Sequence, residues 1–270
     1  MDGIGVVFAI AFSVLYPLVI WFLVMRFRFA EEPYRILFAA FLLGAVVFYL
    51  AYLRKIYILF LGGIALYGVD LIATGFIEEA VKLLVLIIPF IRTKIDEGNG
   101  AFYGLVVGLG FGGGEAILVL GSAAAYFFLN QLSLAIDLIL LDIFLTMTMM
   151  GMEGLLMGLF ILPQLISEIS ILVSVVFGPS LFGLPLITVY ERMMAVLFHA
   201  STAAIIGYGL VRGKTLKYFL IAVFLHIILD AFAVLYVVGL MSILATEIII
   251  GIIALVVFVY AMYTKVLTKG

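Results

Sequence analysis

Long apolar stretches recur along most of this chain, and each is long enough to cross a lipid bilayer as a helix. A span needs about 20 apolar residues, and backbone polar groups inside lipid must find their partners within the segment. Hydrophobic residues make up 67% of the 270 residues, against roughly 45–50% in soluble domains. We therefore predict an all-α, polytopic bundle of transmembrane helices. The seven predicted spans lie near residues 4–25, 36–53, 67–91, 101–129, 187–211, 218–238 and 243–264.

The number of crossings depends on the region 130–185, which contains acidic residues and no basic residue. We predict that this region is either an extra hairpin of two spans or an interfacial cap, so the total is seven or as many as nine. A further break is expected at Gly62-Gly63, because the apolar stretch that begins at Ile56 is too long for one helix. No repeat or linker divides the chain, and we predict a single integral-membrane domain over residues 1–270.

Basic residues in the short loops predict the orientation of the chain. Cytoplasmic loops carry an excess of Lys and Arg, and with seven alternating spans most of these residues fall on one side. The N-terminus is then outside and the C-terminus is cytoplasmic, in what we expect to be the plasma membrane. Arg54 and Lys55 are the exception, because they fall on the opposite side. The basic residues on the predicted cytoplasmic side are Arg26, Arg28, Arg35, Arg92, Lys94, Arg212, Lys214, Lys217, Lys265 and Lys269.

Composition also excludes several kinds of function. The chain has no cysteine, which excludes disulfides, a thiolate nucleophile and a cysteine-ligated metal. The formal net charge is −2, whereas nucleic-acid binding requires a concentrated basic surface. We therefore expect no nucleic-acid partner.

Ionisable residues in four of the predicted spans fall at a similar depth in the bilayer. At about 1.5 Å of rise per residue they lie roughly 13–23 Å from the cytoplasmic boundary. A charge near the bilayer centre costs about 2.5–3.5 kcal/mol and usually has both a partner and a function. The pattern favours one shared site over a set of unrelated packing hydrogen bonds. The residues concerned are Glu78, Glu115, His199, His226 and Asp230.

Helical spacing groups these residues with neighbours on the same face. Glu78 precedes Lys82 by four residues, as His226 precedes Asp230, and residues at this spacing lie side by side on a helix. The carboxylate of Asp230 can therefore orient the ring of His226, which suits proton transfer or metal ligation. The alternative is that these histidines serve only in core packing.

A glycine-rich run from Gly108 to Gly114 lies in the middle of a predicted span. It does not predict a phosphate-binding loop, because no strand precedes it and no Gly-Lys-Ser/Thr follows it. Glycines in membrane helices permit close helix packing, and here they could also leave room for a substrate beside Glu115.

Four short motifs resemble those of the PrsW and YhfC intramembrane peptidases, which belong with the CAAX-prenyl endopeptidases in one superfamily. The run GFIEEAVK that ends at Lys82 is similar to the first motif, and Phe111-x-x-x-Glu115 to the second. Phe111 is PrsW-like at a position where YhfC has histidine. The third and fourth motifs are Glu191-Arg192 with His199, and His226-x-x-x-Asp230. The resemblance covers about residues 70–118 and 187–233, the motif core of a peptidase-like domain.

The resemblance implies an intramembrane endopeptidase in which Glu78 activates a water and Glu79 assists it. His199 and His226 would bind a metal or polarise the peptide carbonyl. Two imidazoles and a carboxylate match a catalytic zinc shell, so the expected cofactor is one divalent ion, with zinc the first choice. A metal-free glutamate–histidine route stays open. In this interpretation Glu115 completes the shell, Asp230 is an orienter or a ligand, and the supporting residues are Lys82, which neutralises one glutamate, Phe111 and Arg192.

The expected partners are the bilayer and a membrane protein or lipidated peptide as the substrate. Two other classes of function remain open at this point. A non-catalytic scaffold could use the polar cluster to bind a partner's transmembrane helix, and an ion-coupled transporter could use it as a proton relay. Transporters usually show inverted repeats, and this sequence shows no such symmetry.

Overall fold

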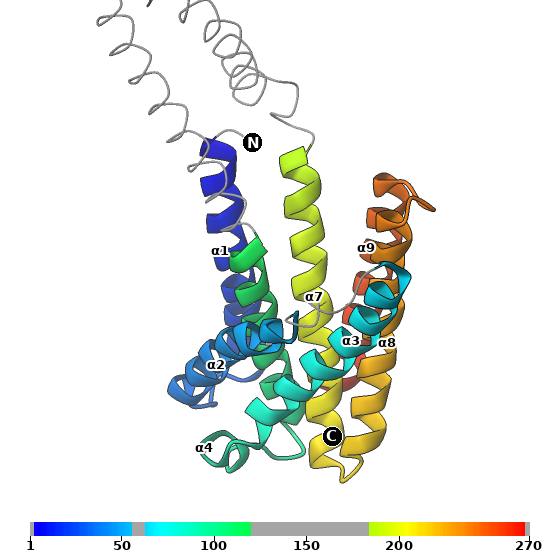
Figure 1. The fold of residues 1–270 in the computed structure, drawn as a ribbon. Helices are drawn as coiled ribbons and strands as arrows, with labels where there is room; N and C mark the ends of the chain where they lie inside the picture. The colour runs from blue at the N-terminus through cyan, green and yellow to red at the C-terminus, as the bar shows by residue number, and fades with distance from the viewer. Residues whose placement is uncertain (1–2, 56–62, 120–183, 268–270) are drawn as a thin grey trace, which may run out of the picture. The chain divides into compact units, whose positions relative to one another are not determined.

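The computed structural model describes residues 3–55, 63–119 and 184–267. Within these ranges the chain is helical and contains no strand (Figure 1), so the all-α prediction is confirmed. The helices are α1 (Gly3–Arg28), α2 (Tyr34–Tyr52), α3 (Gly63–Ile87), α4 (Pro89–Arg92), the helix Gly100–Val119, α7 (Leu184–Val211), α8 (Thr215–Val237), α9 (Ile243–Ala261) and the π-helical turn η3 (Met262–Val266).

Five of the described helical stretches are long and apolar enough to cross a membrane. The predicted spans at 4–25 and 67–91 coincide with α1 and α3, so a described helix lies at every predicted span. Seven or nine crossings remains a prediction, because the proposed hairpin or cap at 130–185 lies almost entirely outside the described residues. The five are Tyr34–Lys55, Gly100–Val119, Ile187–Val211, Thr215–Val237 and Ile243–Val266.

The chain divides into two compact units by its internal contacts. One unit comprises Met1–Ala11 and Val119–Thr188, and the other comprises Phe12–Leu118 and Val189–Gly270. Most of the first unit lies outside the described residues. The second unit contains every residue that the sequence proposes for the site. A single domain over the whole chain remains a prediction.

Local sequence signals explain where several helices begin and end. Proline at the first position of α4 needs no N–H partner, and Ser242 caps α9 by accepting a hydrogen bond from the N–H of Ala245 at 3.3 Å. Beyond α7 and α8 lie Gly213 and Gly239, with φ of 65° and 77°. This left-handed conformation is strained for residues with a Cβ, which is why glycine follows so many helices.

Glycines on two faces of the helix Gly100–Val119 allow its neighbours to approach closely. A Cβ added to Gly112 would lie 2.7 Å from Val196 Cα on α7, and one added to Gly114 would lie 2.6 Å from the carbonyl oxygen of Ala45 on α2. Small residues at such crossings let helix backbones pack together inside a membrane. The glycine run is therefore a packing surface for α2 and α7.

Helix α3 carries the first acidic motif and packs against both α2 and α8 (Figure 1). Gly75 permits the close approach to α8, since a Cβ there would lie 2.8 Å from Ile227 Cγ1. The next turn of α3 places Glu78 and Glu79 opposite His226, which is the neighbour of Ile227. The motif residues of α3 and α8 therefore face each other.

Candidate active site

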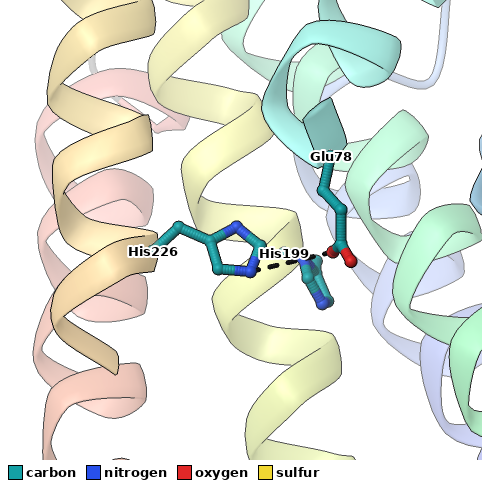
Figure 2. Close-up of side chains that lie close together, drawn as sticks. All are labelled: Glu78, His199 and His226. Atoms are coloured by element: carbon teal, nitrogen blue, oxygen red, sulfur yellow. Dashed lines mark ion pairs between the residues drawn. The ribbon is translucent and has the colours of Figure 1, made fainter. Parts of the chain in front are cut away.

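Glu78 of α3, His199 of α7 and His226 of α8 converge on one point (Figure 2). One ligand atom of each residue lies within 4.8 Å of the others, and all three residues are buried. The two imidazole rings are 5.2 Å apart between centroids. Among the residues that the structure describes, no other cluster of histidines and acids is this compact.

His226 is held through one ring nitrogen and presents the other to the site. Its Nδ1 donates to Glu79 Oε1 at 2.7 Å. Its Nε2 lies 3.7 Å from Glu78 Oε2 and 3.6 Å from Asp230 Oδ2. The sequence suggested Asp230 as the orienting carboxylate, but Glu79 makes the hydrogen bond that fixes the ring.

His199 is also held through Nδ1. Lys82 Nζ lies 3.1 Å from His199 Nδ1, and Glu115 Oε2 lies 2.8 Å from His199 Nε2. Phe111 packs beside the ring at a centroid distance of 4.9 Å. Both imidazoles therefore have Nδ1 bound by the charged pair on α3 and direct Nε2 towards carboxylates.

Lys82 links the two histidines through a single buried ammonium group. Its Nζ donates to Glu79 Oε1 at 2.6 Å and to Thr202 Oγ1 at 3.1 Å, and the side chains of Lys82 and Glu79 are both fully buried. The ammonium also lies 4.9 Å from the centroid of the Phe111 ring. These contacts satisfy a charge that would otherwise be costly to hold inside a membrane. The sequence predicted the pairing of Lys82 with a glutamate.

Arg192 balances the carboxylate at the other end of the cluster. Its Nη1 lies 3.1 Å from Glu115 Oε1, and the guanidinium also forms a bidentate contact with Glu191. Arg192 therefore contacts both a residue of the cluster and its own neighbour in the sequence. Glu115 is bound on one oxygen by Arg192 and on the other by His199.

The sequence interpretation missed Arg54 as a neighbour of the site. Arg54 Nη2 lies 2.7 Å from Glu78 Oε1 and also donates to Thr74 Oγ1 at 2.8 Å. The neighbouring Lys55 pairs with Asp70 at 2.9 Å. The sequence did contain a sign of these pairs. Arg54 and Lys55 fall on the side of the membrane opposite to the other basic residues, against the excess of Lys and Arg expected in cytoplasmic loops, and basic residues in such a place often pair with acids inside the protein.

Charge is closely matched within the cluster. Each of the three glutamates Glu78, Glu79 and Glu115 has a cationic partner, namely Arg54, Lys82 and Arg192. Such pairing offsets the cost of removing charge from water. The cluster therefore brings three carboxylate–cation pairs and two imidazoles within reach of one another, and Glu78, Glu79, Lys82 and both histidines are buried.

The donor atoms fit a divalent ion. The ligand atoms of a tetrahedral ion with bonds of about 2.0–2.1 Å are roughly 3.4 Å apart; His226 Nε2 lies 3.6 Å from Asp230 Oδ2, and the ligand atoms of Glu78, His199 and His226 lie within 4.8 Å of one another. A carboxylate that fixes a histidine through its other nitrogen is the usual support for a metal ligand, and Glu79 has this position at His226. Our predicted ligand set of Glu115, Asp230 and the two histidines stays a prediction; the compact group contains both of these histidines together with Glu78, the predicted base.

Comparison with known proteins identifies a family. A family model described as "PrsW family intramembrane metalloprotease" matches residues 32–182, more than half of the chain. The matched range includes Glu78, Glu79 and Glu115 and ends before His199. No curated protein and no solved structure matches the chain.

Proposed function

Because this chain belongs to the PrsW family of intramembrane metalloproteases, we propose that it cleaves its substrates at the cluster of Glu78, His199 and His226. The observation that carries the proposal is the convergence of one carboxylate and two imidazoles from three separate helices within 4.8 Å. Lipid normally excludes such groups unless they have a task, and these are the residue types that metal-assisted peptide hydrolysis requires.

Glu78 is the general base in this proposal. Its Oε1 is bound by Arg54, so Oε2 is the oxygen that remains directed towards His226. This oxygen lies 3.7 Å from His226 Nε2, so a water in the site beside the imidazole is within its reach, and a general base must lie within hydrogen-bond reach of the proton that it takes. Glu78 Oε2 accepts this proton as the water attacks the peptide carbonyl.

His199 and His226 would hold the ion, which we propose to be zinc, and Asp230 Oδ2 is the carboxylate oxygen beside His226 Nε2. When bound, zinc polarises the peptide carbonyl and makes the attacking water more acidic. Glu79 keeps the Nδ1 proton of His226 on the side away from the site, which leaves Nε2 free to act as a ligand. Glu115 Oε2 lies beside His199 Nε2, as Asp230 Oδ2 lies beside His226 Nε2, and it would complete the shell. Because Lys82 donates to His199 Nδ1, the ring proton of His199 is on Nε2, and Glu115 would accept it when Nε2 becomes a ligand.

The membrane location of the cluster limits the substrate to a membrane protein or a lipidated peptide. Four basic regions on one side of the spans support the predicted orientation, with the N-terminus outside and the C-terminus in the cytoplasm. Arg54 and Lys55 no longer argue against it, because Glu78 and Asp70 pair with them. The motifs resemble those of the PrsW and YhfC peptidases, which belong to one superfamily with the CAAX-prenyl endopeptidases. This resemblance supports the same mechanism of peptide hydrolysis in all three families.

The test is cleavage by the purified protein in liposomes that contain a mixture of single-span model peptides, with products identified by mass spectrometry. Glu78→Gln should lower cleavage by about 10²–10⁴-fold, the usual contribution of a general base. Glu32→Gln is the matched control, because this carboxylate instead bonds Asn99 and Tyr103. Undiminished cleavage by Glu78→Gln would show that Glu78 is not the general base. Absence of cleavage by the wild-type protein would instead favour the non-catalytic scaffold or the ion-coupled transporter.

A further inference from the structure

A polar face of α3 leads from one end of the helix to the catalytic glutamate. Asp70, Thr74 and Glu78 follow one another at intervals of four residues, which places them on one side of the helix. Basic residues at the end of α2 bind each of them: Lys55 pairs with Asp70, and Arg54 binds both Thr74 and Glu78.

Arg54 is anchored at several points, unlike a cation that only balances charge. Its Nη1 donates to the carbonyl oxygen of Ala51 at 2.9 Å, and its Nη2 contacts Thr74 Oγ1 at 2.8 Å and Glu78 Oε1 at 2.7 Å. A guanidinium holds its donors in a rigid plane. Fixing it at Ala51 and Thr74 therefore fixes the direction from which it binds Glu78.

The ion pair of Arg54 and Glu78 is buried on both sides. The side chains are 6% and 4% exposed, whereas those of Lys55 and Asp70 are 31% and 29% exposed. Buried charge pairs are weak contributors to stability compared with apolar packing. A buried pair beside a catalytic cluster is thus better explained by what it does to the geometry of Glu78.

We infer that Arg54 is a positioning residue for the hydrolysis reaction, which binds Glu78 Oε1 so that Glu78 Oε2 faces the reaction centre beside His226 Nε2. The inference rests on the proposed role of Glu78 as the base. Arg54 touches neither substrate nor ion in this account, and it acts only through the carboxylate that it orients. Arg54 lies outside the two motif ranges, residues 70–118 and 187–233, so the motifs do not predict this role.

The test compares Arg54→Lys and Arg54→Gln with Lys55→Gln and Glu78→Gln in the liposome assay, and measures kcat, KM, bound metal and thermal unfolding. Removing the group that orients an active-site residue usually costs about 10–100-fold in activity. Arg54→Gln should therefore lower kcat by about 10–100-fold, with KM within about twofold and bound zinc unchanged.

Arg54→Lys should unfold at the wild-type temperature yet have a kcat about tenfold below wild type, because a lysine cannot reproduce the planar contacts. Lys55→Gln should leave kcat unchanged.

The outcomes separate this inference from the proposed function. If Glu78→Gln is inactive while Arg54→Lys and Arg54→Gln keep wild-type kcat, Arg54 is structural only and the inference is wrong. If Glu78→Gln stays active, Glu78 is not the general base, and the positioning role of Arg54 fails together with the proposed function. Should Arg54→Gln fail to fold, Arg54→Lys decides: full kcat in the folded lysine variant overturns the positioning role, and a reduced kcat at unchanged KM supports it.

Discussion

Replacing Lys82 with methionine should destabilise the protein strongly, since it removes the ammonium group that pairs with Glu79. Methionine has a similar length and keeps the packing against Phe111, but it cannot donate to Glu79, His199 or Thr202. Glu79 is then left as a fully buried carboxylate whose remaining hydrogen-bond donor is His226. The perturbation therefore tests whether charge pairing holds the centre of the cluster together.

The expected magnitude follows from burial. Breaking a buried ion pair by removing one partner costs about 3–5 kcal/mol, because the other charge stays uncompensated, and both side chains of this pair are 0% exposed. Lys55→Met is the matched control: its pair with Asp70 has side chains that are 31% and 29% exposed, for which about 0–1 kcal/mol is typical. The double variant Lys82→Met/Glu79→Gln should recover most of the loss, because a neutral amide still binds His226 and leaves no buried charge.

Equilibrium unfolding in mixed micelles provides the assay. The single tryptophan of the chain, Trp21, stacks on Phe41 with centroids 5.8 Å apart, so its fluorescence reports the packing of α1 against α2. The reasoning is refuted if Lys82→Met costs no more than Lys55→Met, or if adding Glu79→Gln makes the Lys82 variant still less stable.

Two further predictions concern packing and the support of His226. Gly108→Ala should cost about 1–3 kcal/mol as an overpacked contact and should lower cleavage, because the new Cβ would lie 2.6 Å from Ala200 Cα, next to His199. Gly68→Ala, where nothing lies within 4 Å, should leave both unchanged, and equal losses in the two variants would contradict the packing argument. Glu79→Gln alone should lower zinc affinity by about 10–100-fold, as measured by competition with a chelator, because the amide supports the His226 ring less well than a carboxylate. Unchanged affinity would mean that Glu79 does not tune this ligand.

Periodicity and hydropathy were enough to predict the helices, because a bilayer permits few alternatives to a helix of about 20 residues. The convergence of Glu78, His199 and His226 also followed from sequence, through a shared depth that lipid makes expensive for charged groups. Resemblance to known motifs then supplied the chemistry that depth alone could not specify.

The contacts around the cluster could not be read from spacing. Asp230 has the i+4 spacing expected of a partner for His226, yet Glu79 on another helix binds Nδ1 of that ring. Which carboxylate reaches a histidine depends on how α3 and α8 approach each other at Gly75, and a one-dimensional pattern contains no such distance. Arg54 was missed for a similar reason, because its partner Glu78 is 24 positions away on a different helix.

The most direct test of the account is the zinc content of the purified protein and of three variants, determined by mass spectrometry of the metal together with cleavage in liposomes. We predict about one ion per chain in the wild-type protein and in Glu78→Gln, with cleavage absent from the latter, and loss of both ion and cleavage in His199→Ala and His226→Ala. Histidine variants that fold, retain the ion and cleave like the wild type would contradict the claim that Glu78, His199 and His226 form the hydrolytic centre.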